Sequence, residues 1–277
     1  MFPEYNPNNP ELLESIVCFT DILGFSNLIK NTSDSDKGEI LKDLHKHLNY
    51  CYKELDELNP YCSVKTFTDN IILAYPKHGD GESQYGSLIT SFGRFQLNMI
   101  LKGYFTRGGI ALGNYYGDEI FAYGPALIEA YELESNKANY PRIVLSEKMV
   151  ELISNHIAEF YGGSGAPQIQ EILCDKEDNI CFINYLECIE EDFQEGGNLS
   201  QYLEIIKSHK NQIESAIKYN LRNPKVMTKY SWVAKYHNYF CDIYVSPKIK
   251  YSCLEQYKVA NLSSGNFVSV LERTIYR

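Results

Sequence analysis

The sequence predicts an α/β sandwich followed by a helical C-terminal extension. Apolar runs typical of strands alternate with helices of 3.6-residue spacing, in the order β-α-α-β-β-α-β-β-α-β. A hairpin falls inside this order, which is not the order of a doubly wound Rossmann sheet. Neither a G-x-G-x-x-G motif nor a Walker A sequence occurs in the chain.

The first third of the chain is predicted to form a strand, two helices and a hairpin. Residues 16–19 read as a strand and residues 25–30 as a short helix. Apolar residues at helical spacing predict a longer helix over 36–58, which Asn59-Pro60 is expected to end. Strands over 61–67 and 71–75 follow, joined by a tight turn near Asp69 and Asn70.

The middle of the chain continues the alternation. A helix over 84–101 precedes a strand over 103–117, a turn and a short strand. A helix over 124–140 begins with Gly124-Pro125, because proline suits a first helical turn. A strand over 142–146 and a helix over 147–161 complete the predicted sandwich.

The pattern changes after residues 161–168. A strand pair over 169–173 and 180–186, a loop over 190–200, and helices over 199–220 and 225–241 are expected. The last helix carries Trp232 in a band of aromatic residues, which indicates packing, either within the chain or across a dimer interface. We therefore expect two domains, residues 1–195 and a helical extension over 196–277 that packs on the core or on a dimer partner.

Composition excludes several classes of protein. The 277 residues are 44% hydrophobic, but no 18-residue apolar run exists, so no membrane span or membrane partner is expected. The acidic N-terminus lacks the order of a signal peptide, and a cytoplasmic protein is expected. The net charge of −10 argues against nucleic-acid binding. A polyanionic substrate would need metal ions and a few well-placed cations.

The eight cysteines form no C-x-x-C pair, so neither zinc binding nor a disulfide framework is expected. Several of them lie within apolar runs, where cysteine packs as a small apolar side chain. We expect them to belong to the core.

Two acidic residues each follow a strand-like run. Asp21 ends "IVCFTD", and Asp69 lies in the hairpin "VKTFTDNIILAY". A buried carboxylate is costly unless it is paired or holds a metal, and hard oxygen ligands suit Mg²⁺ or Mn²⁺. The pair therefore indicates a site for two divalent cations. Alternatively, Asp21 is a helix N-cap and Asp69 an ordinary turn residue.

Phosphate-binding groups are expected nearby. The turn from Ile22 to Phe25 would present main-chain amides at a helix start. Arg107, within "YFTRGGIALG", could clamp phosphate oxygens with its planar guanidinium. The alternative is that Arg107 forms a structural ion pair.

Four segments resemble the class III nucleotide cyclase catalytic domain in their order: "FTDILGFS", "VKTFTDNIILAY", "FTRGGIALG" and "YGPALIEAYELES". The resemblance covers residues 16–146 and implies a ferredoxin-like core with catalytic residues Asp21, Asp69 and Arg107. Asp21 and Asp69 would bind the two metals with help from the Ile22 carbonyl. Arg107 would hold the triphosphate. The residues implied to bind the nucleotide are Ile22, Leu23, Gly24, Phe25, Lys65, Thr68, Arg107 and Phe121.

The departures from that family concern the base and the transition state. Ile128 and Glu132 occupy the positions of an Asn and an Arg that steady the transition state in purine cyclases. Phe121 replaces the acid that reads the purine, while Lys65 keeps the position of the base-selecting residue. We expect Phe121, or Tyr61 or Tyr115, to close a pocket around a smaller base.

A diverged subgroup is more similar, the anti-phage pyrimidine cyclases of bacterial Pycsar systems. They resemble this chain in "RGGIALG", "GPALIEAYELE" and "PRIVLS", in length and in the C-terminal helices. That resemblance implies a homodimer with active sites at the interface, conversion of UTP or CTP to the 3′,5′-cyclic nucleotide and pyrophosphate, and an effector that binds the product. UTP is preferred here over CTP.

Several alternatives stay open at this point. The chain could be a purine cyclase with replacements for the lost residues, or an inactive nucleotide sensor. Lys65 could be a solvated residue of the hairpin. Glu129, Glu132 and Glu134 are interpreted as a solvated helix face, and His237 as a packed residue.

Overall fold

We describe a computed structural model of the chain, covering residues 3–33, 35–56 and 62–275. The predicted helix end at Asn59-Pro60 and the predicted strand start at Tyr61 lie outside these residues. No helix in the described part combines the length and the apolar character needed to cross a membrane.

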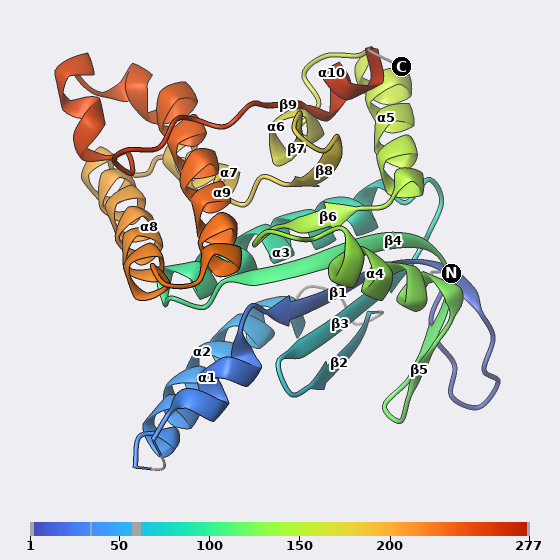
Figure 1. Cartoon of the computed structure of the whole chain (residues 1–277). Coiled ribbons are helices and arrows are strands. Elements are labelled where there is room, and N and C mark those ends of the chain that lie inside the picture. Colours follow the sequence, from blue (N-terminus) through green and yellow to red (C-terminus); the bar gives the residue numbers. More distant parts are fainter. Residues whose placement is uncertain (1–2, 34, 57–61, 276–277) are drawn as a thin grey trace.

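A mixed sheet forms the centre of the molecule (Figure 1). Within the described residues it has nine strands in the order β2-β3-β1-β4-β6-β8-β7-β9, and β5 pairs with β4. The hairpin β2–β3 lies inside this fold, as predicted, and only β4 and β6 pair in parallel among these neighbours. The strands are β1 (Leu13–Ile22), β2 (Ser63–Phe67), β3 (Asn70–Pro76), β4 (Thr106–Gly117), β5 (Ala122–Tyr123), β6 (Ile143–Leu145), β7 (Ile172–Asp175), β8 (Ile180–Ile183) and β9 (Phe267–Ser269).

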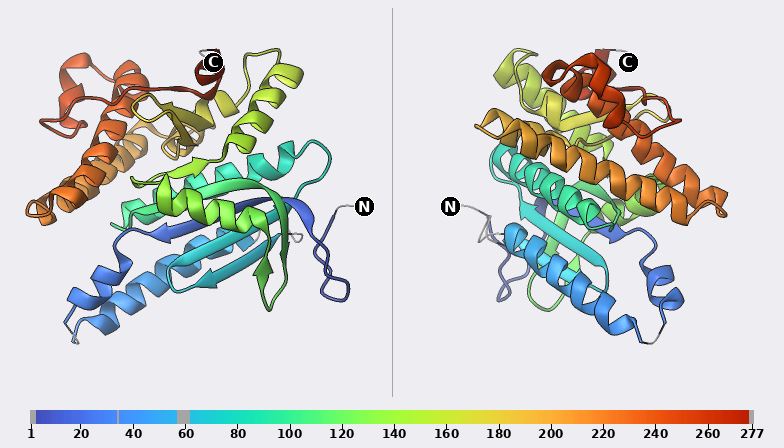
Figure 2. Two further views of the ribbon diagram at one scale, coloured as in Figure 1. Left: turned by 45° about the vertical axis from the view of Figure 1, so that its right-hand side comes forward. Right: turned by 90° about the vertical axis from the view of Figure 1, so that its left-hand side faces the viewer.

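Helices cover both faces of the sheet. α4 packs on β1 and β4 on one face, while α2, α3 and α8 follow one another on the other, as the right-hand view of Figure 2 shows. The predicted mixed α/β fold is confirmed. The helices are α1 (Phe25–Asn31), α2 (Lys37–Asp56), α3 (Glu82–Leu101), α4 (Pro125–Asn136), α5 (Glu147–Tyr161), α6 (Gln168–Glu171), α7 (Glu187–Gln194), α8 (Leu199–Tyr219), α9 (Pro224–Phe240) and α10 (Val270–Ile275), with short η segments at Cys241–Val245, Ser246–Lys248 and Tyr251–Gln256.

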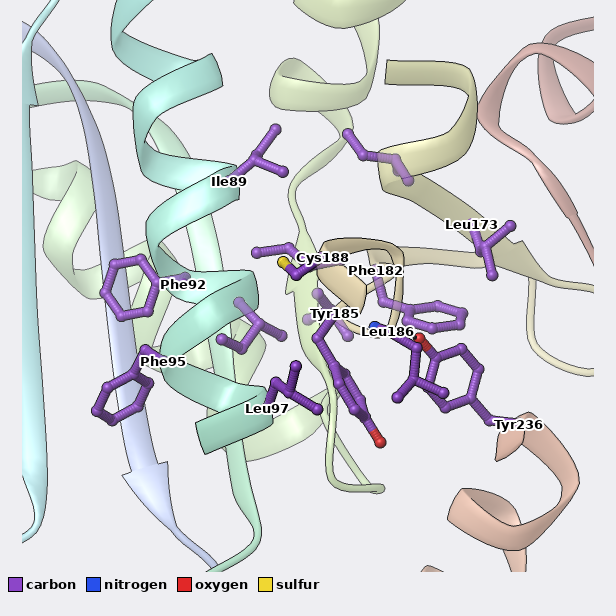
Figure 3. Close-up of a cluster of buried hydrophobic side chains, with 14 of the residues drawn as sticks. Ile89, Phe92, Phe95, Leu97, Leu173, Phe182, Tyr185, Leu186, Cys188 and Tyr236 are labelled. Carbon is purple, nitrogen blue, oxygen red and sulfur yellow. Dashed lines mark hydrogen bonds between the residues drawn. The ribbon is translucent and has the colours of Figure 1, made fainter. Parts of the chain in front are cut away.

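The larger core lies between α3, the strands β7 and β8, and the C-terminal helices (Figure 3). Phe92 and Phe95 of α3 are buried there together with Phe182 of β8 and Tyr236 of α9. Burying each such ring stabilises the fold by roughly 1.5–3 kcal/mol. Cys18, Cys174, Cys181, Cys188 and Cys241 are buried too, as the apolar runs around them predict.

Close packing of α4 on the sheet depends on glycine. A Cβ atom at Gly109 would lie 2.4 Å from the carbonyl oxygen of Ala130 and 2.5 Å from Cβ of Leu133. Both distances are shorter than a van der Waals contact, so only glycine lets the α4 backbone approach β4 this closely. The "RGG" sequence therefore sets how near α4 lies to Arg107.

The C-terminal segment is joined to the core rather than separate from it. β9 pairs with β7, so this segment adds a strand to the sheet and is not wholly helical as predicted. The Trp232 indole N–H donates to Asp175 at 2.7 Å, and its ring stacks on Tyr140 at 5.4 Å. Trp232 and Tyr236 are buried, so these two residues of the aromatic band pack within the chain.

Two local predictions were wrong. The predicted strand over 169–173 begins later, because residues 168–171 form α6 and β7 starts at Ile172. α7 forms where a loop over 190–200 was expected, because Cys188 and Ile189 are buried and draw Glu187 and Glu190 into the protein with them. Arg142, which directly precedes β6, is fully buried and pairs with Asp175 at 3.2 Å.

Candidate functional site

Asp21 and Arg107 face each other across the β1–β4 ladder. They are register partners near the end of β1 and the start of β4, and a guanidinium nitrogen of Arg107 lies 3.1 Å from Oδ2 of Asp21. Side chains opposite each other in antiparallel strands point to the same face of the sheet. The strand register itself therefore brings this acid and this base together.

Asp69 reaches the same place from the tip of the β2–β3 hairpin. The β1–β3 ladder ends at Thr20 and Ile71, so Asp21 and Asp69 both lie just beyond the last paired residues. Their carboxyl groups are close enough to share a hydrogen bond. Thr68 precedes Asp69 with φ of 57°, and its hydroxyl lies 2.9 Å from Oδ1 of Asp69. A β-branched residue in this left-handed conformation is strained, and such strain is frequent at functional sites.

The two carboxyl groups disturb each other's protonation. Burial and the hydrogen bond to Asp21 raise the pKa of Asp69 to about 6. Burial also raises the pKa of Asp21, although the bonds to Asp69 and Arg107 oppose that rise. Two acids this close resist double ionisation unless a cation compensates their charge. The pair is therefore suited to a metal.

The donor set fits hard divalent cations. Within the described part of the chain, no cluster of three or more His, Cys, Asp or Glu side chains could hold a metal. Two carboxylates are nevertheless the protein ligand set that Mg²⁺ commonly uses, since substrate phosphates and water complete its coordination. Asp21 and Asp69 satisfy that requirement.

Glu134 is a site residue that the sequence interpretation missed. It is 3% exposed, not part of a solvated face, and its Oε1 atom lies 2.6 Å from the same guanidinium nitrogen of Arg107. A signal was available: Ala126, Ala130 and Glu134 follow one another at four-residue spacing, and the two alanines pack on the sheet. Glu132 is exposed, as expected.

Arg107 is held between Asp21 and Glu134, so the alternative of an ion pair is present in the structure. Its Nε atom is buried and has no hydrogen-bond partner among the described residues. Arg107 also lines a cavity of about 710 Å³ together with Ile22, Leu23, Gly24 and Phe25.

The turn predicted to bind phosphate is only partly available. The Leu23 amide donates to the Phe105 carbonyl at 2.7 Å, so Leu23 cannot offer this donor to a phosphate. Gly24 adopts φ of 80° and begins α1. Among the described residues, no hydrogen bond engages the amides of Gly24 and Phe25, as is usual at a helix start.

Lys65 and Phe121 lie elsewhere on the chain. Lys65 is on β2 opposite Ile72, and Phe121 follows the far end of β4, which Figure 1 shows at the opposite end of that strand from α1. The Phe121 amide donates to Asp118 at 3.0 Å. The pKa of Asp118 is lowered mainly by the Tyr116 hydroxyl, and Lys65 also contributes. Lys65 and Phe121 thus form a second group around Asp118.

Phe121 is one of several exposed apolar side chains on α4, on the segment before it and at the end of β2, which we together call the α4 face. Phe121 is half exposed, whereas Tyr115 is fully buried and cannot close a pocket as predicted. Tyr61 lies outside the described residues. The α4 face comprises Phe67, Ile120, Phe121, Tyr123, Ile128 and Tyr131.

No family model and no curated protein match the chain. Among solved structures it is similar to a bacterial light-regulated adenylyl cyclase, with 16% identity, a TM-score of 0.43, and coverage of 64% of this chain and 52% of that one. A class III adenylyl cyclase-like ATP-binding protein from Pseudomonas aeruginosa has 13% identity and a TM-score of 0.43, covering 56% and 38%. The guanylyl cyclase Cya2 has 12% identity and a TM-score of 0.39, covering 62% and 92%. The chain spans about half of the first of these proteins.

Proposed function

We propose that this protein is a metal-dependent nucleotide cyclase that acts on a pyrimidine nucleoside triphosphate. UTP is the preferred substrate and CTP the second choice. The reaction joins the ribose 3′-oxygen to the α-phosphorus and breaks the bond from that phosphorus to the bridging oxygen, which leaves with its electron pair as pyrophosphate. The hydroxyl proton passes to solvent.

The observation that carries this proposal is the meeting of Asp21 and Asp69 beside Arg107. The four cyclase-like segments were matched by sequence, and their acidic and basic residues come from three separate strands or turns. Only the fold could bring them within reach of one ligand. An inactive relative would have no physical need for two carboxyl groups that repel each other.

Asp21 and Asp69, with the Ile22 carbonyl, would hold two Mn²⁺ or Mg²⁺ ions. Such ions lower the pKa of the attacking hydroxyl and neutralise charge on the phosphates. Thr68 positions Asp69 through its hydroxyl contact. Arg107 binds the triphosphate from the wall of the cavity, and Glu134 fixes the orientation of its side chain. Positioning and charge stabilisation supply most of the rate.

A homodimer would complete the active site. Lys65 and Phe121 lie apart from the acid pair on one chain, so they would contact the base of a nucleotide held by a partner subunit. The exposed residues of the α4 face supply an apolar surface for that association. Phe121 in place of a purine-reading acid supports a smaller, pyrimidine base.

The cellular role would follow from the product. The protein would act in the cytoplasm, without a membrane or nucleic-acid partner, and release a cyclic nucleotide as a second messenger of anti-phage defence. A companion effector would bind that cyclic nucleotide. No surface of the enzyme itself needs to contact the effector.

Incubation of purified protein with each of the four nucleoside triphosphates and Mn²⁺, followed by mass spectrometry, tests the proposal. Cyclic UMP or cyclic CMP is expected from the wild type and none from Asp69→Ala. Cyclic AMP or GMP as the main product would replace pyrimidine by purine specificity. Nucleotide binding without any cyclic product would contradict cyclase activity.

A further inference from the structure

The 710 Å³ cavity beside the acid pair is closed on one side by the C-terminal helices. One wall is the β1–α1 turn with the start of β4, which carries Arg107. The other wall is formed by α8 and α9, with Gln212, Ala216 and Lys229 among its residues. Figure 1 shows the ends of α8 and α9 near the start of β4 and α1. The extension thus contributes directly to the site.

The charges that line this cavity are all positive. Arg107 and Lys229 are the charged residues among the described side chains of its wall, and the other polar groups there are amides and hydroxyls. Asp21 and Glu134, which pair with Arg107, do not line the cavity, so the charged groups that face it are cationic although the chain as a whole has a net charge of −10. Such a lining favours an anionic ligand.

Lys229 also lacks the partner that similar lysines have. Among the described residues it forms no ion pair, whereas the largely buried Lys77, Lys248 and Lys258 each lie 2.8 Å from a carboxylate. Burial lowers the pKa of Lys229, and the nearby charge of Arg107 lowers it further, while Asp21 and Glu134 act in the opposite direction. A multivalent anion between Lys229 and Arg107 would relieve this repulsion.

We propose that Lys229 and Arg107 bind the terminal diphosphate of the nucleoside triphosphate, the part that leaves as pyrophosphate. The nucleotide in this statement rests on the function proposed above, whereas the diphosphate site rests on the cavity and its two cations. Lys229 is then a phosphate-binding residue supplied by α9. The extension has a role in substrate binding as well as in packing.

Calorimetric titration of sodium pyrophosphate into the full chain tests this assignment. Lys229→Gln is expected to weaken pyrophosphate binding about tenfold or more, because a hydrogen bond to a charged group is lost. Lys225→Gln is the matched control, since Lys225 is an exposed lysine of the same helix outside the cavity wall. It should change the Kd less than twofold. Lys229→Arg should bind more tightly than Lys229→Gln.

Equal pyrophosphate affinity in the wild type, Lys229→Gln and Lys225→Gln would overturn the assignment, and so would no binding to the wild type. If Lys229→Gln melts at a lower temperature than the wild type, Lys229→Arg decides by the same comparison with Lys225→Gln. Cyclic product with Lys229-independent binding would retain the proposed function and refute the site. Lys229-dependent binding without cyclic product would support the site and refute the function.

Discussion

Asp21 and Asp69 carry an electrostatic cost that the fold maintains. The pKa of Asp69 is raised to about 6 by burial and by its carboxyl neighbour, so protons and metal ions compete for the same oxygens. Repulsion of this kind lowers stability at neutral pH, where both groups tend to ionise. A metal site explains why such a pair would be kept.

Metal binding should therefore depend on pH. Below about pH 6, Asp69 is increasingly protonated, and the apparent Mn²⁺ affinity should fall by up to about tenfold per pH unit. Above that pH the affinity should level off. Mn²⁺ titrations followed by electron paramagnetic resonance between pH 5 and 8 measure this. A flat profile, or the same profile in Asp69→Asn, would argue against Asp69 as a ligand.

Glu134 is expected to matter for stability because it pairs with Arg107 in a buried position. Glu134→Ala should lower the free energy of unfolding by about 1–3 kcal/mol, because it removes a buried ion pair and leaves the Arg107 guanidinium with one carboxylate fewer. Glu132→Ala, at an exposed position on the same helix, should change it by less than about 0.5 kcal/mol. Urea denaturation measures both. Similar values for the two variants would show that Glu134 does not hold Arg107.

Three residues of this site could be recognised from sequence motifs. Asp21 and Asp69 each follow a strand-like run, and Arg107 opens another, although the β1–β4 pairing that joins Asp21 to Arg107 spans 86 residues. Glu134 was missed although the helical spacing from Ala126 and Ala130 indicates its direction. Lys229 lies in no recognisable motif, and its place depends on how α9 packs far along the chain, which no local pattern reveals.

At the scale of elements, α8 and α9 are joined by a buried chain of polar groups. The Tyr185 hydroxyl lies 2.9 Å from Nε2 of His209, the Nδ1 atoms of His209 and His237 lie 2.9 Å apart, and Nε2 of His237 lies 2.8 Å from the Tyr257 carbonyl. Because a carbonyl only accepts, His237 donates from Nε2. Burial lowers the pKa of both histidines, so both are neutral at pH 7, and Nδ1 of His237 then accepts from Nδ1 of His209. The prediction that His237 is packed is confirmed.

Acid should destabilise this helix pair. Burial lowers the pKa of His237 to about 4 and that of His209 well below its ordinary value. The unfolded chain then binds protons first, so the free energy of unfolding falls as the pH drops below about 6.5. His237 alone should contribute a loss of about 2 kcal/mol at pH 5.

Urea denaturation at pH 7.5 and 5 checks this expectation. The double variant His209→Gln/His237→Gln should be less stable at pH 7.5 and should lose less stability on acidification. His45→Gln, at an exposed position on α2, should behave like the wild type. A wild-type loss that the double variant retains in full would place the acid sensitivity elsewhere.

The elements themselves were predictable where their patterns are long. The 20-residue α3, the strand β4 and the 21-residue α8 were all expected from periodicity. α7 was not, because its glutamates read as a loop although Glu187 and Glu190 are buried. β9 was missed because a three-residue strand has no period, and only its pairing with β7 defines it.

At the scale of the whole molecule, the α4 face is expected to form a dimer. Ile128 and Tyr131 are 61% and 53% exposed, values that are costly for large apolar side chains unless a partner covers them. Ile128→Asp should convert the dimer to monomers and strongly reduce cyclase activity, because each monomer holds only part of the site. Light scattering after size-exclusion chromatography measures the mass.

Ile243→Asp is the control for the α4 face. Ile243 is 51% exposed on the C-terminal segment, so its replacement adds the same charge without touching the α4 face. It should leave the mass and the activity unchanged. A monomeric wild type that is fully active would show that one chain suffices.

Anomalous diffraction from crystals soaked with Mn²⁺ and a non-hydrolysable UTP analogue tests the central claim most directly. We expect manganese peaks within about 2.5 Å of carboxylate oxygens of both Asp21 and Asp69. Crystals of Asp69→Asn should show weaker peaks or none. Manganese bound elsewhere, with both carboxyl groups free of metal, would contradict the account.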